Sequence, residues 1–201
     1  MITAVILAAG RSTRFPDNKL LKKLGGKALI EIILERFLRS KVDRVIVVVG
    51  WQAERLVGTV RAMGAETVYN EGYEEGMSSS VRVGVRAALN SEAVIIHPAD
   101  VPFIGTKTID KVVESYINSR RPIVVAGYGG RLGHPILFDG SLIPEILHIS
   151  EETMGLKAVV SRHRDKILIV ETEPACLFDV DRPDDLRRVV EVLGLRDCFI
   201  W

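Results

Sequence analysis

The sequence predicts an α/β protein whose mostly parallel β-sheet is covered by helices on both faces. Apolar runs of strand length alternate along the chain with amphipathic stretches of helical spacing. The runs are rich in β-branched residues and nearly continuous, as in strands that are buried on both faces of a parallel sheet. The 201 residues, 47% of them hydrophobic, are enough for a full core. We therefore expect a single domain over residues 1–201.

Each predicted element follows from its own pattern. Continuous apolar runs predict five strands, at residues 2–7, 45–49, 93–96, 122–126 and 167–170. Apolar residues at helical spacing predict four helices, at residues 29–40, 80–89, 107–117 and 183–193. The last helix has Pro183 in its first turn, followed by Asp184 and Asp185, which suit a helix N-terminus.

Residues 128–150 break this alternation. Residues 128–133 are rich in glycine and predict a turn, and residues 136–138 predict a short strand. An insertion here is expected near the ends of the main strands, where α/β sheets bind ligands.

Composition excludes several classes of protein. Lys and Arg total 27 against 26 for Asp and Glu, so no overall electrostatic attraction to nucleic acid is expected. No apolar run is long enough to span a bilayer, and the N-terminus lacks a secretory signal, so we expect the cytoplasm. Cys176 and Cys198 match no metal spacing, and free, buried or incidental roles are expected for them. The apolar tail up to Trp201 could form a contact or fold on the protein's own surface.

The segment 7–19 predicts a phosphate-binding loop. Small residues after the first strand let the backbone approach a ligand, and basic residues then supply positive charge for a triphosphate. The alternative is a tight turn with solvated basic side chains. Residues 25–27 are not a Walker motif, because the earlier glycine is missing. The candidate nucleotide-binding residues of this loop are Leu7, Ala8, Ala9, Gly10, Arg11, Ser12, Arg14 and Lys19.

Two acidic segments are candidates for a metal site. Asp100 follows the strand at 93–96 between two prolines, where its carboxylate can hold Mg²⁺ against triphosphate oxygens or cap a nearby helix. Asp179 and Asp181 are expected on one side of an extended segment. One of the two could complete a metal site with Asp100, and the other could cap the helix that begins at Pro183.

Polar residues elsewhere could contact the substrates. Asn70 and Ser78–Ser80 precede a predicted helix and offer groups that read a base edge or meet a phosphate; Ser79 or Ser80 could also cap that helix. His134 lies between Gly133 and Pro135 and is expected to be exposed, either binding a phosphate or pterin-like substrate or serving a structural role. His97 is expected to be partly buried.

Together these segments resemble the molybdenum cofactor cytidylyltransferase-like family of nucleotidyltransferases, which is related to molybdenum cofactor guanylyltransferase. Leu7 to Arg14, followed by Lys19, match its signature Leu-Ala-Ala-Gly-x-Ser-x-Arg and the later Lys, and residues 98–102 match Pro-Ala-Asp-x-Pro. Residues 70–84, 133–135 and 179–185 match the remaining motifs in order. The sequence departs from the usual pattern at Pro16, where glycine is more common.

This resemblance implies a Rossmann-like three-layer αβα sandwich of the nucleotide-diphospho-sugar transferase type. It also implies Mg²⁺-dependent transfer of a nucleoside monophosphate to a phosphate acceptor, with release of pyrophosphate. Arg14 and Lys19 would hold the triphosphate, Asp100 and Asp181 the metal, and His134 would face the acceptor. The residues implied in nucleoside binding are Ala8, Ala9, Gly10, Asn70, Ser78, Ser79, Ser80 and Ala99.

Within this family, Ala8-Ala9-Gly10 and Pro98-Ala99-Asp100 are typical of enzymes that use CTP. The implied acceptor is molybdopterin, with a molybdenum hydroxylase as a possible recipient of the product. Three alternatives stay open: a guanylyltransferase of the same cofactor, another cytidylyl- or sugar-phosphate nucleotidyltransferase, and a non-catalytic carrier that delivers the finished cofactor.

Overall fold

The structure is a computed structural model that describes residues 1–15 and 17–192. Pro16 and residues 193–201 lie outside the described residues. The expectations for Pro16, Cys198 and Trp201 therefore fall outside them as well.

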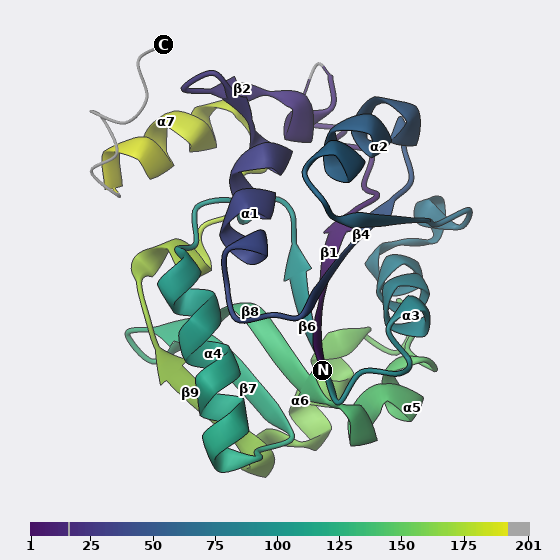
Figure 1. Ribbon diagram of the computed structural model, residues 1–201, viewed down its shortest axis with the longest axis vertical. Helices are drawn as coiled ribbons and strands as arrows, with labels where there is room; N and C mark the ends of the chain where they lie inside the picture. Colours follow the sequence, from purple (N-terminus) through teal and green to yellow (C-terminus); the bar gives the residue numbers. More distant parts are fainter. Residues whose placement is uncertain (16, 193–201) are drawn as a thin grey trace.

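A seven-stranded sheet forms the centre of the molecule (Figure 1). The strand order is β5-β4-β1-β6-β8-β7-β9, and every neighbouring pair is parallel except those made by β8, which runs antiparallel to β6 and β7. The strands are β1 (Ile2–Ala8), β4 (Arg44–Val49), β5 (Glu66–Tyr69), β6 (Ala93–Pro98), β7 (Ile123–Tyr128), β8 (Arg131–Asp139) and β9 (Ile167–Glu171). A separate small hairpin joins β2 (Lys23–Leu24) to β3 (Lys27–Ala28).

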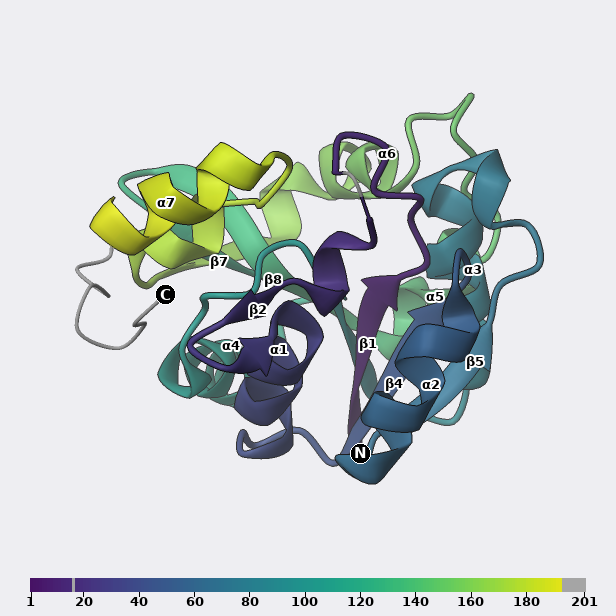
Figure 2. The same ribbon diagram turned by 90° about the horizontal axis from the view of Figure 1, so that it is seen from above.

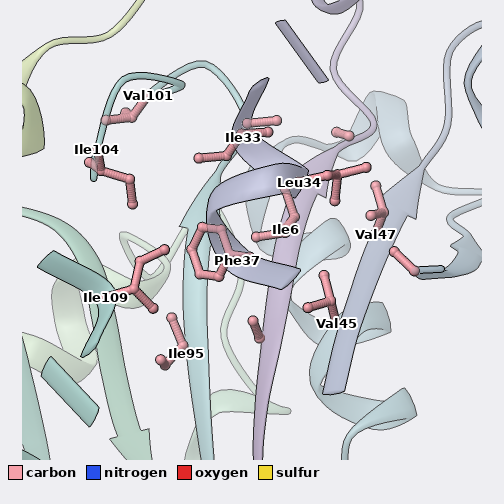
Figure 3. Packing of buried hydrophobic residues seen from close by; sticks show 14 of the residues in the cluster. Ile6, Ile33, Leu34, Phe37, Val45, Val47, Ile95, Val101, Ile104 and Ile109 are labelled. Carbon is pink, nitrogen blue, oxygen red and sulfur yellow. The ribbon is translucent and has the colours of Figure 1, made fainter. Parts of the chain in front are cut away.

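Helices cover both faces of this sheet, as Figures 1 and 2 show. One buried cluster joins the sheet to α1 (Leu29–Leu38), α2 (Ala53–Ala62) and α4 (Thr106–Ser119). Figure 3 shows the centre of this cluster, where Phe37 extends from α1 among Ile6, Ile33 and Ile95. The cluster on the opposite face joins the sheet to α3 (Met77–Ala87), α5 (Ile143–Ile146) and α6 (Leu156–Arg162). The predicted three-layer αβα architecture is thus confirmed.

The C-terminal helix α7 (Pro183–Val192) packs outside these layers. Val180 and Leu186 form a third buried cluster with Leu24 of the small hairpin and with Leu29 and Ile32 of α1. This cluster fixes the segment before α7 beside the opening loop. No helix among the described residues is long and apolar enough to cross a membrane.

All five predicted strands are present, with ends that differ by one or two residues. The sequence analysis did not predict β5, α2 or the β2–β3 hairpin. β5 is a four-residue edge strand without a buried residue, so it lacks the continuous apolar run that marks the central strands.

The predicted turn at residues 128–133 is wrong in extent. Only Gly129 and Gly130 form the turn, and both have positive φ, whereas β8 already begins at Arg131. Gly133 therefore lies within the strand. Glycine is needed there because a Cβ would lie 2.5 Å from the carbonyl oxygen of Cys176. Cys176 itself is a free, buried cysteine, as predicted.

Two helix boundaries also differ from the prediction. The helix expected at 80–89 is α3, which starts three residues earlier, at Met77 after Gly76. Gly76 has φ 102°, a conformation that favours glycine, and this turn brings the serines inside the helix. The helix expected at 29–40 ends at Leu38, so Ser40 lies beyond it.

The packing of α3 on the sheet leads to a test with an internal control. A Cβ on Gly84 would overlap Val5 Cγ1 and lie 2.8 Å from Val48 Cγ2, so Gly84→Ala is expected to destabilise the protein by about 1–3 kcal/mol. Gly58, in α2, has no atom within 4 Å of an added Cβ. Gly58→Ala is therefore expected to stabilise the protein by about 0.5–1 kcal/mol. Urea unfolding measures both, and equal effects would contradict the packing described.

Candidate functional site

A cleft of about 270 Å³ opens where β1 and β6 end. The chain runs from β1 to β4 and β5 on one side and then crosses to β6 on the other, so the order of the strands reverses at this point. Ligands of open α/β sheets bind at such reversals, outside the carboxyl ends of the strands. The lining residues are Leu7, Ala8, Ala9, Gly10, Ser12, Lys19, Leu20, Tyr73, Gly76, Met77, Ser80, Pro98, Ala99 and Asp100.

Nine of the predicted site residues line this cleft: Leu7, Ala8, Ala9, Gly10, Ser12, Lys19, Ser80, Ala99 and Asp100. Tyr73, Gly76 and Met77 also line the cleft, although they were not among the predicted site residues. Met77 is more than half exposed, and Tyr73 lies in a short 3₁₀ turn before Gly76. The signal for this wall was the pair of glycines at 72 and 76, which marks a turn directly before α3.

Lys19 is the centre of a cluster of charges beside the cleft. Its Nζ donates to Asp100 Oδ2 at 3.0 Å, to Asp181 Oδ1 at 3.3 Å and to the carbonyl oxygen of Val180 at 2.9 Å. The Lys19 side chain is 13% exposed, against 27% for Asp100 and 40% for Asp181. One cation thus joins two carboxylates that the sequence analysis had assigned to a metal.

The local fold holds Lys19 in this position. Asn18 caps the short 3₁₀ helix Lys19–Leu21, because its Oδ1 accepts from the backbone N–H of Leu20 at 3.1 Å. Asp17, just before it, pairs with Arg55 of α2, and this bond lowers the pKa of the Asp17 carboxyl to about 2. The loop is therefore tied both to its own helix start and to α2.

The two arginines of the loop point to different partners. Arg14 forms an ion pair and hydrogen bond with Asp181 Oδ2, so Asp181 contacts both Arg14 and Lys19. Arg11 pairs with Glu74 at 2.8 Å, and both side chains are more than half exposed. Neither arginine lines the cleft. Since exposed ion pairs contribute little to stability, both can exchange partners when an anion arrives.

Asn70 joins the serines of α3. Its Nδ2 donates to Ser79 Oγ at 2.8 Å and to Ser80 Oγ at 2.9 Å, and all three side chains are buried. Neither serine caps the helix, so that expectation is wrong: the N-cap is Gly76, and both lie inside the first turn. Ser80 reaches the cleft, whereas Asn70, Ser78 and Ser79 lie behind its wall.

The structure distinguishes between the two aspartates that precede α7. Asp181 meets Lys19, whereas Asp179 lines a separate cleft of about 350 Å³ with Tyr128, the last residue of β7, and Arg131, the first residue of β8. The carboxylate at the start of α7 is that of Asp185, whose Oδ2 accepts from the backbone N–H groups of Asp181 and Arg182. The expectation that Asp179 or Asp181 caps this helix is therefore wrong.

Two histidines lie near Asp100. His97 is fully buried rather than partly buried, its Nε2 donates to the carbonyl oxygen of Val101 at 2.9 Å, and burial lowers its pKa to about 3. The His134 ring packs edge-on against it, with 6.1 Å between ring centroids. His134 is not exposed as predicted: it is half-buried, and burial lowers its pKa against the opposing charge of Asp100. Neither Nδ1 finds a partner among the described residues.

The acidic groups fit a divalent cation in part. Asp100 and Asp181 converge on one positive charge, and carboxylate oxygens are the donors that Mg²⁺ prefers. Within residues 1–15 and 17–192, no group of three or more His, Cys, Asp or Glu side chains is gathered as a metal site. A metal held here would therefore need further oxygen ligands, such as those of a triphosphate.

The chain matches a known protein family over most of its length. The family model described as the MobA-like NTP transferase domain matches residues 4–167. Nicotine blue oxidoreductase of Paenarthrobacter nicotinovorans is 28% identical over 94% of this chain and 96% of that protein. A probable molybdenum cofactor guanylyltransferase of Pyrococcus horikoshii is 31% identical over 60% of this chain and 59% of that protein. Against a bifunctional GlmU protein of Symbiobacterium thermophilum, the match spans only 26% of the relative.

Solved structures share the fold. A nucleotidyl transferase from Methanothermobacter, Mth528, superposes with a TM-score of 0.83 over 97% of this chain and 98% of that one, at 23% sequence identity. At this identity the likeness concerns the fold, and it includes the whole seven-stranded sheet with its flanking helices.

The buried His97 predicts a pH dependence of stability. Its pKa is about 3 in the folded state, whereas 6.5 is the ordinary value in an unfolded chain. Between these values only the unfolded chain binds the proton, so the free energy of unfolding falls as the pH falls, by up to about 1.4 kcal/mol per pH unit. Urea unfolding between about pH 4.5 and 6.5 is expected to have a shallower pH slope in His97→Phe than in the wild type. Identical slopes would refute this assignment.

Proposed function

The chain belongs to the MobA-like NTP transferase family of nucleotidyltransferases, and we propose that it transfers CMP from CTP to the phosphate of a molybdopterin-type acceptor, releasing pyrophosphate. The contacts of Lys19 with Asp100 and Asp181 beside the cleft carry this proposal. They bring a cation for the triphosphate and two carboxylates for a divalent metal to the same edge of the sheet. The reaction is proposed for a single domain in the cytoplasm.

The proposed Mg²⁺ would be held by Asp100 and Asp181. When bound, it supplies positive charge that polarises the triphosphate and stabilises the leaving pyrophosphate. Lys19 and Arg14 contact these same carboxylates in the structure. We expect both side chains to turn toward the phosphate oxygens when nucleotide and metal enter. The metal ion then neutralises the carboxylates in place of Lys19 and Arg14.

Positioning supplies most of the proposed catalysis. The acceptor phosphate is already an anion near neutral pH, so the attack on the α-phosphate needs no strong general base. Lys19 is held by three contacts and is mostly buried, which gives its charge a fixed place at the cleft. Once it has turned to the phosphate oxygens, a cation held this close to the cleft stabilises the negative charge that develops there.

The proposed acceptor side is that of His134. Its ring lies close enough to Asp100 for the carboxylate charge to affect its pKa, while burial favours the neutral form. A neutral imidazole can donate one hydrogen bond to an acceptor phosphate without being a cation. The relative named a probable molybdenum cofactor guanylyltransferase supports an acceptor of the molybdopterin type.

The proposed nucleotide is CTP. Ala8-Ala9-Gly10 and Pro98-Ala99-Asp100 support it through their resemblance to the cytidylyl branch, and all six of these residues line the cleft. Ala9 is 2% exposed and packs against Gly50, where an added Cβ would lie 2.9 Å from the Ala9 Cβ. The space beside Ala9 is therefore too small for a side chain at position 50.

A second candidate function is favoured by one relative. Nicotine blue oxidoreductase matches this chain along almost its full length, so a redox reaction in the same cleft deserves a direct test. The charge cluster at Lys19 favours the transferase, because nucleotidyl transfer requires cations at a triphosphate whereas hydride transfer does not.

A substrate screen decides between these functions. Purified protein with Mg²⁺ is given each of the four nucleoside triphosphates with molybdopterin or with a panel of sugar phosphates, and pyrophosphate is measured. We expect release with CTP and molybdopterin. Release with GTP alone would overturn the proposed nucleotide, and release only with a sugar phosphate would overturn the acceptor. Release with none of these combinations would overturn the transferase function and leave the redox candidate.

Two acidic residues of the proposed metal site can be tested against a third acidic residue that lies outside it. Asp100→Asn and Asp181→Asn are expected to lower kcat/KM by a factor of about 100 or more, because each removes charge from the proposed metal site. Asp179→Asn changes the same kind of side chain two residues from Asp181, in a different cleft, and is expected to stay within about 3-fold of wild type. Circular dichroism checks that all three variants fold. Full activity of Asp100→Asn would remove the basis of the metal assignment.

A further inference from the structure

His97 is a buried side chain that reaches from the sheet into the loop carrying Asp100. It lies on β6, three residues before Asp100, and no part of it is exposed. Its ring packs against Phe37 of α1, the aromatic residue labelled in Figure 3, with 5.1 Å between ring centroids. An apolar ring could fill this space equally well, so the polar atoms of His97 need an explanation.

The loop after β6 is held by four backbone groups. The N–H of Ala99 donates to Leu7 O at 3.0 Å, and the N–H of Val101 donates to Pro98 O at 3.2 Å. The carbonyl of Asp100 accepts from the N–H of Val180 at 2.7 Å. The remaining group is the carbonyl of Val101, and its partner is a side chain, His97 Nε2, at 2.9 Å. The backbone is therefore fixed on both sides of the Asp100 side chain.

A neutral histidine at position 97 is unfavourable in free energy because one of its ring nitrogens has no hydrogen-bond partner among the described residues. Because burial and the neighbouring His134 keep the ring neutral, it has a single N–H, and that hydrogen must be on Nε2 to meet the Val101 carbonyl. Its Nδ1 is then a buried acceptor without a partner among the described residues. An unmatched buried acceptor is unfavourable by about 1–3 kcal/mol, whereas phenylalanine would avoid this loss. The bond to Val101 is the evident compensation.

We infer that His97 is a positioning residue for the transfer reaction: through Val101 it holds the loop so that the Asp100 carboxylate stays directed at the cleft when Lys19 turns to the triphosphate. This inference rests on the proposed function. In the structure Lys19 itself restrains the Asp100 carboxylate. Once Lys19 contacts phosphate instead, the backbone anchors alone set its direction, and His97 supplies one of them.

Three substitutions separate this role from simple core packing. His97→Phe keeps a ring of similar size against Phe37 but removes the donor. His97→Met removes the donor with a flexible side chain, in case the phenylalanine variant does not fold. His97→Gln retains an N–H donor of similar reach. The control is Thr3→Val, which breaks the buried hydrogen bond of 2.7 Å between Thr3 Oγ1 and Ser91 Oγ on the same sheet, far from Asp100.

Kinetics give the first readout. A small displacement of Asp100 is expected to lower kcat by about 10- to 100-fold in His97→Phe and His97→Met, with KM for CTP within about 3-fold of wild type. We expect His97→Gln to recover most of kcat and Thr3→Val to leave it unchanged. A kcat near the wild-type value in a folded donor-free variant would overturn the inference, as would a His97→Gln variant no better than His97→Phe.

Hydrogen exchange gives a readout that does not depend on activity. The amides of Ala99 and Val101 are expected to exchange about 10-fold faster in His97→Phe and His97→Met, and at the wild-type rate in His97→Gln and Thr3→Val. Unchanged exchange in the donor-free variants would overturn the inference. If wild-type protein releases no pyrophosphate in the substrate screen, the proposed function fails, and exchange alone then decides whether His97 holds this loop.

Discussion

The site depends on one ammonium group that three distant parts of the chain share. Lys19 Nζ meets Asp100 at the end of β6 and Val180 and Asp181 before α7, residues that are 81, 161 and 162 positions away. Each of these segments also has its own support: the capped 3₁₀ helix holds Lys19, His97 and Val180 hold the Asp100 loop, and a buried cluster holds Val180. The contact therefore joins three fixed segments and does not itself have to order them.

The sequence predicted those elements whose pattern is set by burial alone. Strands such as β1 and β4 are apolar on both faces, which only a central parallel strand requires. The strand predicted at residues 136–138 is the C-terminal part of β8, whereas the N-terminal part was predicted as a turn because it contains Gly133, and glycine is a common turn residue. The reason for glycine at position 133 is instead the close approach of Cys176. This contact joins residues 43 positions apart, so no local sequence pattern reveals it.

The same division applies to the candidate site. Residues at the ends of β1 and β6 could be predicted to meet, because parallel strands bring their carboxyl ends to one edge of the sheet. Alternation alone could not decide between Asp179 and Asp181, since it gives both the same side; the family resemblance favoured Asp181, and only the path toward α7 separates the two in space. The exposure of His134 was misjudged, because its burial depends on His97 in a neighbouring strand.

The position of the segment before α7 has a consequence for synthesis on the ribosome. The N-terminal part of a chain emerges first, and the sheet strands from β1 to β9 are complete before Asp181 leaves the ribosome. A nascent chain can thus fold its sheet before Asp181 is available to pair with Lys19. The proposed site is then completed only when the segment before α7 has followed the sheet, so a chain that stops before Asp181 lacks one of the two carboxylates that contact Lys19.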